Sequence, residues 1–148
     1  MTLKTPASLK HEHQELHADL VAATKAGGKT GAAAEAVARA LHPHFVKEEE
    51  YALPPLGLLA LLADGKLPPD PDAVIAMTER LRKDLGHMLH EHKAIVIELH
   101  KLMEAAKSEN KLEYSHFAEK LKLHAQTEEE VLYPAAILIG EYLKLRKG

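Results

Sequence analysis

The chain has 148 residues, which fits one domain with a buried core. It contains no cysteine, so disulfides, thiolate metal ligands and thiol catalysis are excluded. Its net charge is −3 and its lysines and arginines are spread along the sequence, so nucleic-acid binding is not expected, but eleven histidines exceed the needs of packing.

The first predicted helix begins near Thr5, which is suited to the N-cap, with Pro6 at the first helical position. Gly27-Gly28 predicts where it ends. His13 and His17 fall on the same face of this helix as its leucines. The face expected to be buried therefore carries two candidate metal ligands.

The second helix is expected from Ala32 to about Leu53, with His44 and Glu48 on its inner side. Pro43 lies inside this run, where it removes one backbone hydrogen bond. Two interpretations follow: the helix bends at Pro43, or a fresh helix begins there.

A break follows the second helix at Pro54-Pro55, and residues 56–62 form a short apolar helical extension that Asp64-Gly65 ends. Residues 66–72 are a polar, proline-rich connection in the middle of the chain. Asp70-Pro71, at its end, predicts the N-cap and first residue of the third helix.

The third helix carries His92 on its apolar stripe. Asn110 and Glu113 resemble a capping box and predict the start of the fourth helix. On that helix His124 and Glu128 fall on the apolar face. Four long helices with similar patterns and short connections predict an all-α, up-down-up-down four-helix bundle.

The sequence contains an internal repeat. Residues 44–54 are matched eighty positions later by residues 124–134, and both copies read His, three residues, three glutamates and a proline ten residues after the His. Glu12-His13 is matched seventy-nine positions later by Glu91-His92. The bundle is therefore expected to have a pseudo-two-fold repeat of helix pairs within one domain, residues 1–148, whose halves are about 6–64 and 70–146.

The spacing within each copy points to metal. His44 and Glu48 are four residues apart, as are His124 and Glu128, so each pair shares one helical face. A carboxylate among leucines loses several kcal/mol of hydration unless something neutralises it, and a divalent cation does so. Taken singly, a His on an apolar stripe is usually a hydrogen-bonded core residue and a His-x-x-x-Glu an ordinary helix pair. The repetition favours metal binding.

These motifs resemble the hemerythrin-like, or HHE cation-binding, family of four-helix bundles. The resemblance implies a centre of two iron ions, oxo- or hydroxo-bridged, with bridging carboxylates. The third helix departs from the hemerythrin pattern because Val96 stands four residues after His92. His17 is the candidate that supplies the missing nitrogen. The predicted metal ligands are His13, His44, Glu48, His92, His124, Glu128 and His17.

Other metal sites fit less well. Histidine with carboxylate also suits zinc, manganese or copper, but six or seven ligands are too many for one tetrahedral zinc. Ferritin-like centres need two Glu-x-x-His motifs, and only Glu113–His116 is present. The His-Glu-x-x-His motif of metalloproteases is absent.

The resemblance implies that the protein binds dioxygen or a related small ligand, peroxide or nitric oxide, for storage, delivery or sensing. Open alternatives are an enzyme that decomposes hydrogen peroxide or reduces nitric oxide, an iron donation or repair protein, and a metal-free helical interaction module. The N-terminus lacks a secretory signal and no apolar run approaches about 20 residues, so a cytoplasmic protein that does not contact membranes is expected.

The remaining polar residues of the motifs are interpreted as follows. Four glutamates turn away from the apolar stripe and are expected to be solvated or to lie behind the ligands: Glu49, Glu50, Glu129 and Glu130. Tyr51 and Tyr133 are expected to be structural, and a radical or hydrogen-bonding role for either is the open alternative. Six histidines are expected on the surface: His11, His42, His87, His90, His100 and His116.

Overall fold

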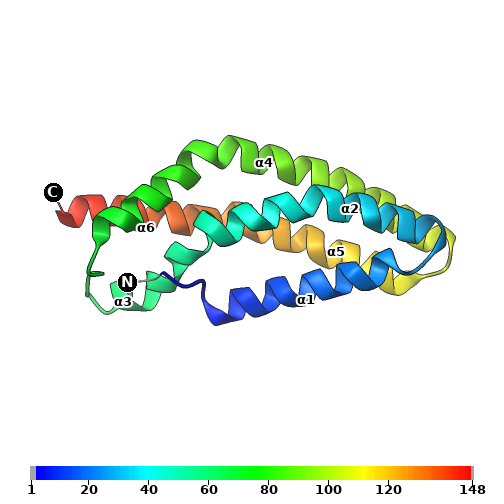
Figure 1. The fold of residues 1–148 in the computed structure, drawn as a ribbon, viewed down its shortest axis with the longest axis horizontal. Coiled ribbons are helices and arrows are strands. Elements are labelled where there is room, and N and C mark those ends of the chain that lie inside the picture. Colours follow the sequence, from blue (N-terminus) through cyan, green and yellow to red (C-terminus); the bar gives the residue numbers. More distant parts are fainter. Residues whose placement is uncertain (1–2, 148) are drawn as a thin grey trace.

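The structure is a computed structural model that describes residues 3–147. Within this part of the chain every regular element is a helix and there is no strand. The long helices lie side by side along the long axis of the molecule (Figure 1). They are α1 (Ala7–Thr24), α2 (Gly28–Lys47), α4 (Pro71–Ser108), α5 (Leu112–Thr127) and α6 (Tyr133–Lys147). The predicted all-α class is confirmed, and α5 continuing into α6 gives the four long helical runs of a four-helix bundle.

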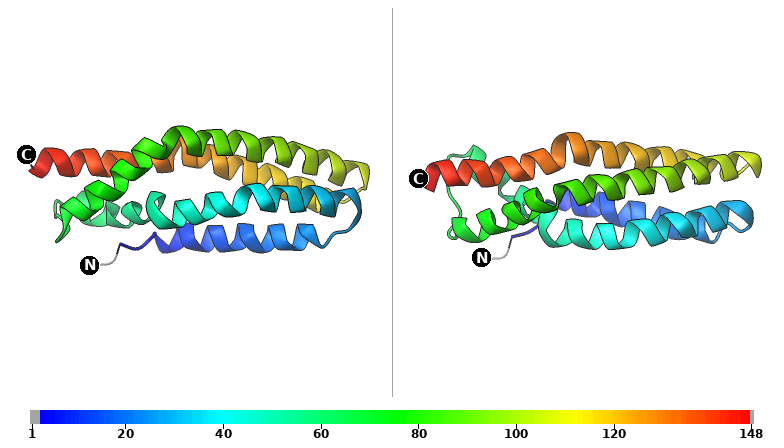
Figure 2. Two further views of the ribbon diagram at one scale, coloured as in Figure 1. Left: turned by 45° about the horizontal axis from the view of Figure 1, so that its top comes forward. Right: turned by 90° about the horizontal axis from the view of Figure 1, so that it is seen from above.

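The turns from α1 to α2 and from α4 to α5 lie at the same end of the molecule (Figure 1). The opposite end holds the short helices, η2 (Pro54–Leu58, a 3₁₀ helix) and α3 (Leu59–Ala63), and the connection to α4. The start of α4 and the C-terminal part of α6 extend past the other long helices at that end (Figure 2). No helix within residues 3–147 is long and apolar enough to cross a membrane.

The start of α1 differs slightly from the prediction. Pro6, and not Thr5, is the N-cap residue, and no side chain caps the helix. At the other end, Gly27 and Gly28 have φ angles of 75° and 58°, and this left-handed turn leads directly into α2.

Helix α2 begins at Gly28, four residues before the predicted start at Ala32. The cause is Glu109, which follows α4 and reaches the first turn of α2. Its carboxylate accepts hydrogen bonds from the backbone N–H groups of Lys29 and Thr30, at 2.9 and 2.8 Å, and from the Thr30 hydroxyl. A carboxylate satisfies the free N–H groups of a helix start and is stabilised by the helix dipole.

The capping box predicted for the fourth helix is wrong. Asn110 has a φ angle of 57°, and the next residue, Lys111, donates its backbone N–H to Ala106 at 2.7 Å. Asn110 therefore ends α4 in a left-handed turn, a role that asparagine tolerates well. Lys111 is the N-cap of α5, and no side chain caps that helix. The cap predicted for the third helix is confirmed, because Asp70 accepts the backbone N–H of Ala73.

Helix α2 passes through Pro43 without ending. The run changes at Glu48, where it widens into a π-helical turn, η1 (Glu48–Ala52), and the fourth run does the same at η3 (Glu128–Leu132). Each turn is followed by a proline, at positions 54 and 134. In a regular α-helix that proline would clash with the carbonyl four residues earlier, and the wider turn relieves the clash. The sequence predicted helix through both stretches and a break at Pro54-Pro55, but it did not predict the π turns.

The buried apolar residues form two separate clusters. The first lies towards the end with the α1–α2 and α4–α5 turns, and its members include Leu20, Val37, Leu41, Leu99, Leu102 and Leu121. The second lies towards the opposite end, and its members include Leu53, Leu56, Leu81, Met88, Ile139 and Leu143. The buried histidines and glutamates of the repeated motifs lie between the two clusters in every helical run.

Candidate metal centre

Six of the seven predicted ligands are buried in the middle of the bundle. Each long run contributes one His, and the second and fourth runs each add a Glu from the first position of the π turn. All six side chains are at most 6% exposed: His13, His44, Glu48, His92, His124 and Glu128. They form two groups whose ligand atoms lie within 4.8 Å of one another: His44, Glu48, His92 and Glu128, and His13, His124 and Glu128.

Glu128 belongs to both groups. Its Oε2 lies 3.5 Å from Nε2 of His13 and 3.2 Å from Nε2 of His124. Its Oε1 lies 3.3 Å from Nε2 of His92. Glu48 is in the first group only, although its Oε1 lies 3.7 Å from Nε2 of His44 and 3.9 Å from Nε2 of His13. The two carboxylates thus face the histidines of both groups.

Several polar atoms of these two groups are buried without a hydrogen-bond partner. Among the described residues these are Nδ1 and Nε2 of His13, Oε1 of Glu48, Nε2 of His124 and Oε2 of Glu128. An unpaired buried polar group costs about 1–3 kcal/mol, and more when charged, so five in one layer are not expected in a purely structural core. All five belong to residues of the two groups and face their neighbours at distances too long or too poorly aligned for hydrogen bonds.

The outward nitrogens of the histidines face a second set of glutamates. We call Glu12, Glu49, Glu91 and Glu129 the outer carboxylates. Nδ1 of His92 lies 3.0 Å from Glu129, Nδ1 of His44 lies 3.3 Å from Glu91, and Nδ1 of His124 is hydrogen-bonded to Glu12. Nδ1 of His13 lies 3.8 Å from Glu49, beyond hydrogen-bond distance. A carboxylate that holds the Nδ1 proton leaves the Nε2 lone pair free for a cation.

The outer carboxylates follow the internal repeat. Glu12 and Glu91 stand immediately before His13 and His92 in the sequence. Each pairs with a histidine on a different helix, Glu12 with His124 and Glu91 with His44. Glu49 and Glu129 are the second glutamates of the two Glu-Glu-Glu runs. The repeated Glu-His pair was the sequence signal for Glu12 and Glu91, but their role was not predicted, because it depends on which helices are neighbours.

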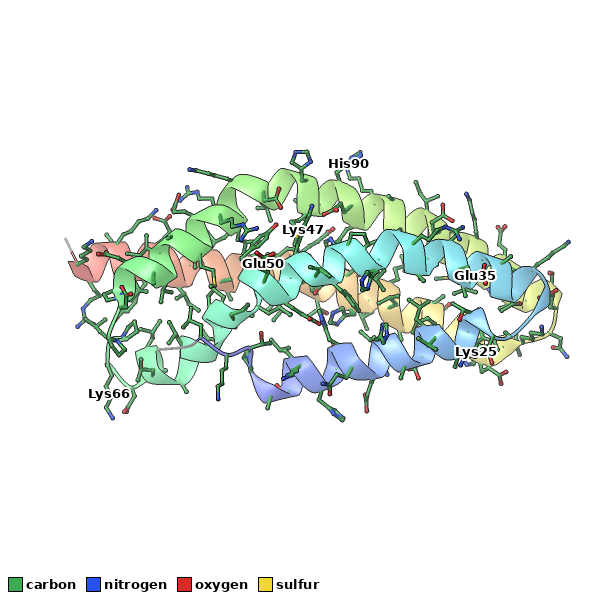
Figure 3. All side chains as sticks on the ribbon, viewed as in Figure 1. Lys25, Glu35, Lys47, Glu50, Lys66 and His90 are labelled. Atoms are coloured by element: carbon green, nitrogen blue, oxygen red, sulfur yellow. The ribbon has the colours of Figure 1, made fainter. Side chains whose placement is uncertain are left out.

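Lys47 stabilises the pair that Glu91 forms with Nδ1 of His44. It extends from α2 towards α4 (Figure 3), and its Nζ lies 3.2 Å from both carboxylate oxygens of Glu91. Glu91 therefore bridges Lys47 and Nδ1 of His44 at the surface of the bundle.

The carboxyl groups of Glu48 and Glu128 differ in acidity. Burial, together with the neighbouring Glu128 carboxylate, raises the pKa of Glu48 well above its ordinary range. Burial also opposes ionisation of Glu128, but the nearby Glu48 and the surrounding histidines outweigh burial and lower the pKa of Glu128. Without a cation, a proton on Glu48 therefore relieves the repulsion between the two carboxylates.

Burial likewise opposes the charge on the histidines. It lowers the pKa of His44, with nearby His92 adding to the effect. For His124 the carboxylates of Glu128 and Glu12 outweigh burial, and the pKa is raised.

Tyr133 lies inside the first group, which sequence reasoning had missed. It is fully buried and donates its hydroxyl to Oε2 of Glu48 at 2.7 Å. The hydroxyl oxygen of Tyr133 also lies 3.1 Å from Nε2 of His44 and 3.2 Å from Nε2 of His92. Tyr51, in contrast, is hydrogen-bonded to Asp84 and lies under the guanidinium of Arg80.

His17 belongs to neither group. It is exposed and lines a surface pocket together with Leu20, Val21 and Phe45. The six histidines predicted to lie on the surface are all exposed, and His90 projects outward from α4 (Figure 3).

The residues of the two groups fit divalent metal ions. They offer imidazole nitrogens and carboxylate oxygens, and these ligand atoms converge from all four helical runs. Comparison of the chain with protein-family models, curated proteins and solved structures found no match. The candidate site is therefore defined by the geometry of its own residues.

Proposed function

We propose that the chain is a hemerythrin-like protein whose two repeated helix pairs form an up-down-up-down bundle around two iron ions. His44, Glu48 and His92 would hold one ion, His13 and His124 the other, and Glu128 would bridge them. The main support is the set of five buried, unpaired atoms that belong to these residues. Proton sharing between Glu48 and Glu128 would satisfy only the two carboxylate oxygens, whereas two cations would satisfy four of the five atoms and leave Nδ1 of His13, which faces Glu49.

Iron is favoured over the other metals by the resemblance of the repeated motifs to hemerythrin-like proteins. Bound ferrous iron would supply a reversible site for dioxygen or a related small ligand. The residues of the chain provide the apolar surroundings that such a site needs. Phe45 stacks on the ring of His13 at 4.3 Å, and buried Met88 and Ile95 lie one turn to either side of His92. These side chains limit the access of water to the ligand nitrogens.

The decisive experiment loads the protein with ferrous iron without air, then measures metal content and the visible absorption spectrum before and after exposure to oxygen. Two irons per chain and a new band that disappears when oxygen is removed would support an oxygen-binding protein. Two irons that oxidise irreversibly would favour an enzyme. A protein that retains no iron would contradict both and would leave zinc or a metal-free bundle.

Tyr133 favours one second candidate, a peroxide-decomposing enzyme that uses the same centre. Its phenol is a hydrogen-bond donor next to Glu48, His44 and His92 in an otherwise enclosed site. A hydroxyl in this position could donate to a peroxide held there. Oxygen evolved from hydrogen peroxide by the iron-loaded protein, measured with an oxygen electrode, would distinguish this candidate from reversible binding.

A further inference from the structure

A groove on the surface reaches the centre from the side of α1. It has a volume of about 620 Å³ and lies between the N-terminal segment, the start of α1 and the residues from η1 to Pro54. His13, a candidate ligand, and Glu49, the outer carboxylate that faces it, both line this groove. The inner wall of the groove is thus part of the candidate metal centre.

His13 is the least satisfied histidine of the centre. Its side chain is 4% exposed, and neither ring nitrogen has a hydrogen-bond partner. The Nδ1 atoms of His44, His92 and His124 each have a carboxylate partner, whereas Glu49 stays 3.8 Å from Nδ1 of His13. Glu49 is also largely exposed, so the groove side of His13 is the more open one.

The lining of the groove combines positive charge with apolar surface. Lys4 and Lys10 are exposed, and neither forms an ion pair with a carboxylate within residues 3–147. Glu49 is the acidic residue of the lining, so the lining carries a net positive charge. Leu53 and Pro54 provide an apolar wall beside these charges.

We propose that this groove is the entrance to the metal centre and that it takes a small organic anion with an apolar body. The anionic group would lie near Lys4 and Lys10, and the apolar body against Leu53 and Pro54. The volume is far larger than a diatomic gas requires and falls within the range of roughly 300–1,000 Å³ typical of sites for organic ligands. The inference rests on the proposed function, because the groove opens onto the same metal centre at His13.

Gly57 fixes one wall of the groove. A Cβ atom at Gly57 would lie 1.9 Å from the backbone carbonyl oxygen of Lys4, so the N-terminal segment can pack there only against glycine. Gly57→Ala should therefore displace Lys4 and change the groove without changing any charge or any candidate ligand.

The test uses the full chain loaded with ferrous iron, with sodium octanoate as the probe and isothermal titration calorimetry as the readout. Octanoate should bind once per chain, while octyltrimethylammonium should not bind. Lys10→Glu should weaken the binding of octanoate roughly tenfold, because one nearby positive charge is replaced by a negative one. Lys120→Glu is the matched control: Lys120 is an exposed lysine that lines a different pocket, without any candidate ligand, and its replacement should leave binding unchanged. Gly57→Ala should also weaken the binding of octanoate.

Iron content measured in the same samples separates the two proposals. Iron-replete protein that does not bind octanoate would overturn the groove inference and leave the proposed metal centre standing. Equal octanoate binding by wild type and Lys10→Glu would overturn it as well, because the lysines would then have no role. Wild-type protein that retains no iron would overturn the proposed function, and the entrance inference would fall with it.

Discussion

The hydroxyl of Tyr133 lies 2.7 Å from Oε2 of Glu48, although the two residues are 85 positions apart in the sequence. Tyr133 is the first residue of α6 and follows the second π turn, whereas Glu48 begins the first π turn. Each copy of the motif therefore contributes to the surroundings of the other. The same hydroxyl is within 3.2 Å of His44 and His92, so one phenol contacts three of the four residues of the first group.

Tyr133→Phe keeps the ring and removes this hydrogen bond. In metal-free protein the free energy of unfolding should fall by about 1–3 kcal/mol, because Glu48 loses a buried partner. With metal bound the loss should be smaller, since Glu48 would then have a cation as a partner. Urea unfolding with and without metal measures both values. An equal loss in the two forms would argue against Glu48 as a ligand.

His13 and His17 provide a matched pair on α1. His13→Ala should remove one metal ion per chain, whereas His17→Ala should leave metal content unchanged, because His17 is exposed and outside both groups. Glu128→Ala should remove both ions, because Glu128 belongs to both groups. Elemental analysis after gel filtration measures the content. If both histidine variants bind as much metal as wild type, the second group is not a metal site.

Glu12 should affect metal affinity without touching the metal. Glu12→Gln removes the charged partner of Nδ1 of His124, and loss of such a partner typically costs about 10–100-fold in affinity. Glu15→Gln is the control, because Glu15 is exposed on the same helix and pairs with His11. Competition with a coloured chelator gives the affinities. An unchanged affinity for Glu12→Gln would show that Glu12 does not orient His124.

Glu109 should make stability depend on acid pH. Hydrogen bonds from Thr30 and from the backbone N–H of Lys29 hold the pKa of Glu109 at about 2, below its ordinary value of 4.5. Because the pKa is lower in the folded state, the ionised carboxylate stabilises the folded protein at pH values above 4.5. This stabilisation is lost as the pH falls from 4.5 towards 2. Glu109→Gln should therefore be less stable than wild type at pH 6, and the difference should shrink at pH 3. Urea midpoints at the two pH values test this, and a constant difference would contradict it.

Gly140 and Gly86 should respond oppositely to alanine. A Cβ at Gly140 would lie 1.9 Å from Oγ1 of Thr78 where α4 meets α6, and such overpacking typically costs about 1–3 kcal/mol. A Cβ at Gly86 meets nothing within 4 Å, so alanine there should stabilise α4 by about 0.5–1 kcal/mol. Thermal unfolding of the metal-free variants compares them. A stabilised Gly140→Ala would show that α4 and α6 are not packed so closely.

The parts of the centre that sequence could predict depend on local geometry. His124 and Glu128 share a helical face because of their spacing, and Asp70 caps α4 through a contact three residues away. The start of α2 could not be predicted, because the residue that caps it, Glu109, comes from another part of the chain. The position of Tyr133 was missed for a similar reason: it depends on the π turn before it and on a neighbouring helix.

The polar layer at the centre also divides the apolar interior into two clusters that do not merge. Apolar contacts alone therefore do not make the two ends of the bundle unfold together. In metal-free protein, amide hydrogen exchange should show the ends opening as separate units. Ions bound by residues of all four helical runs would make the two ends unfold together in one cooperative transition. Metal binding would then increase the cooperativity of folding in addition to its chemical role.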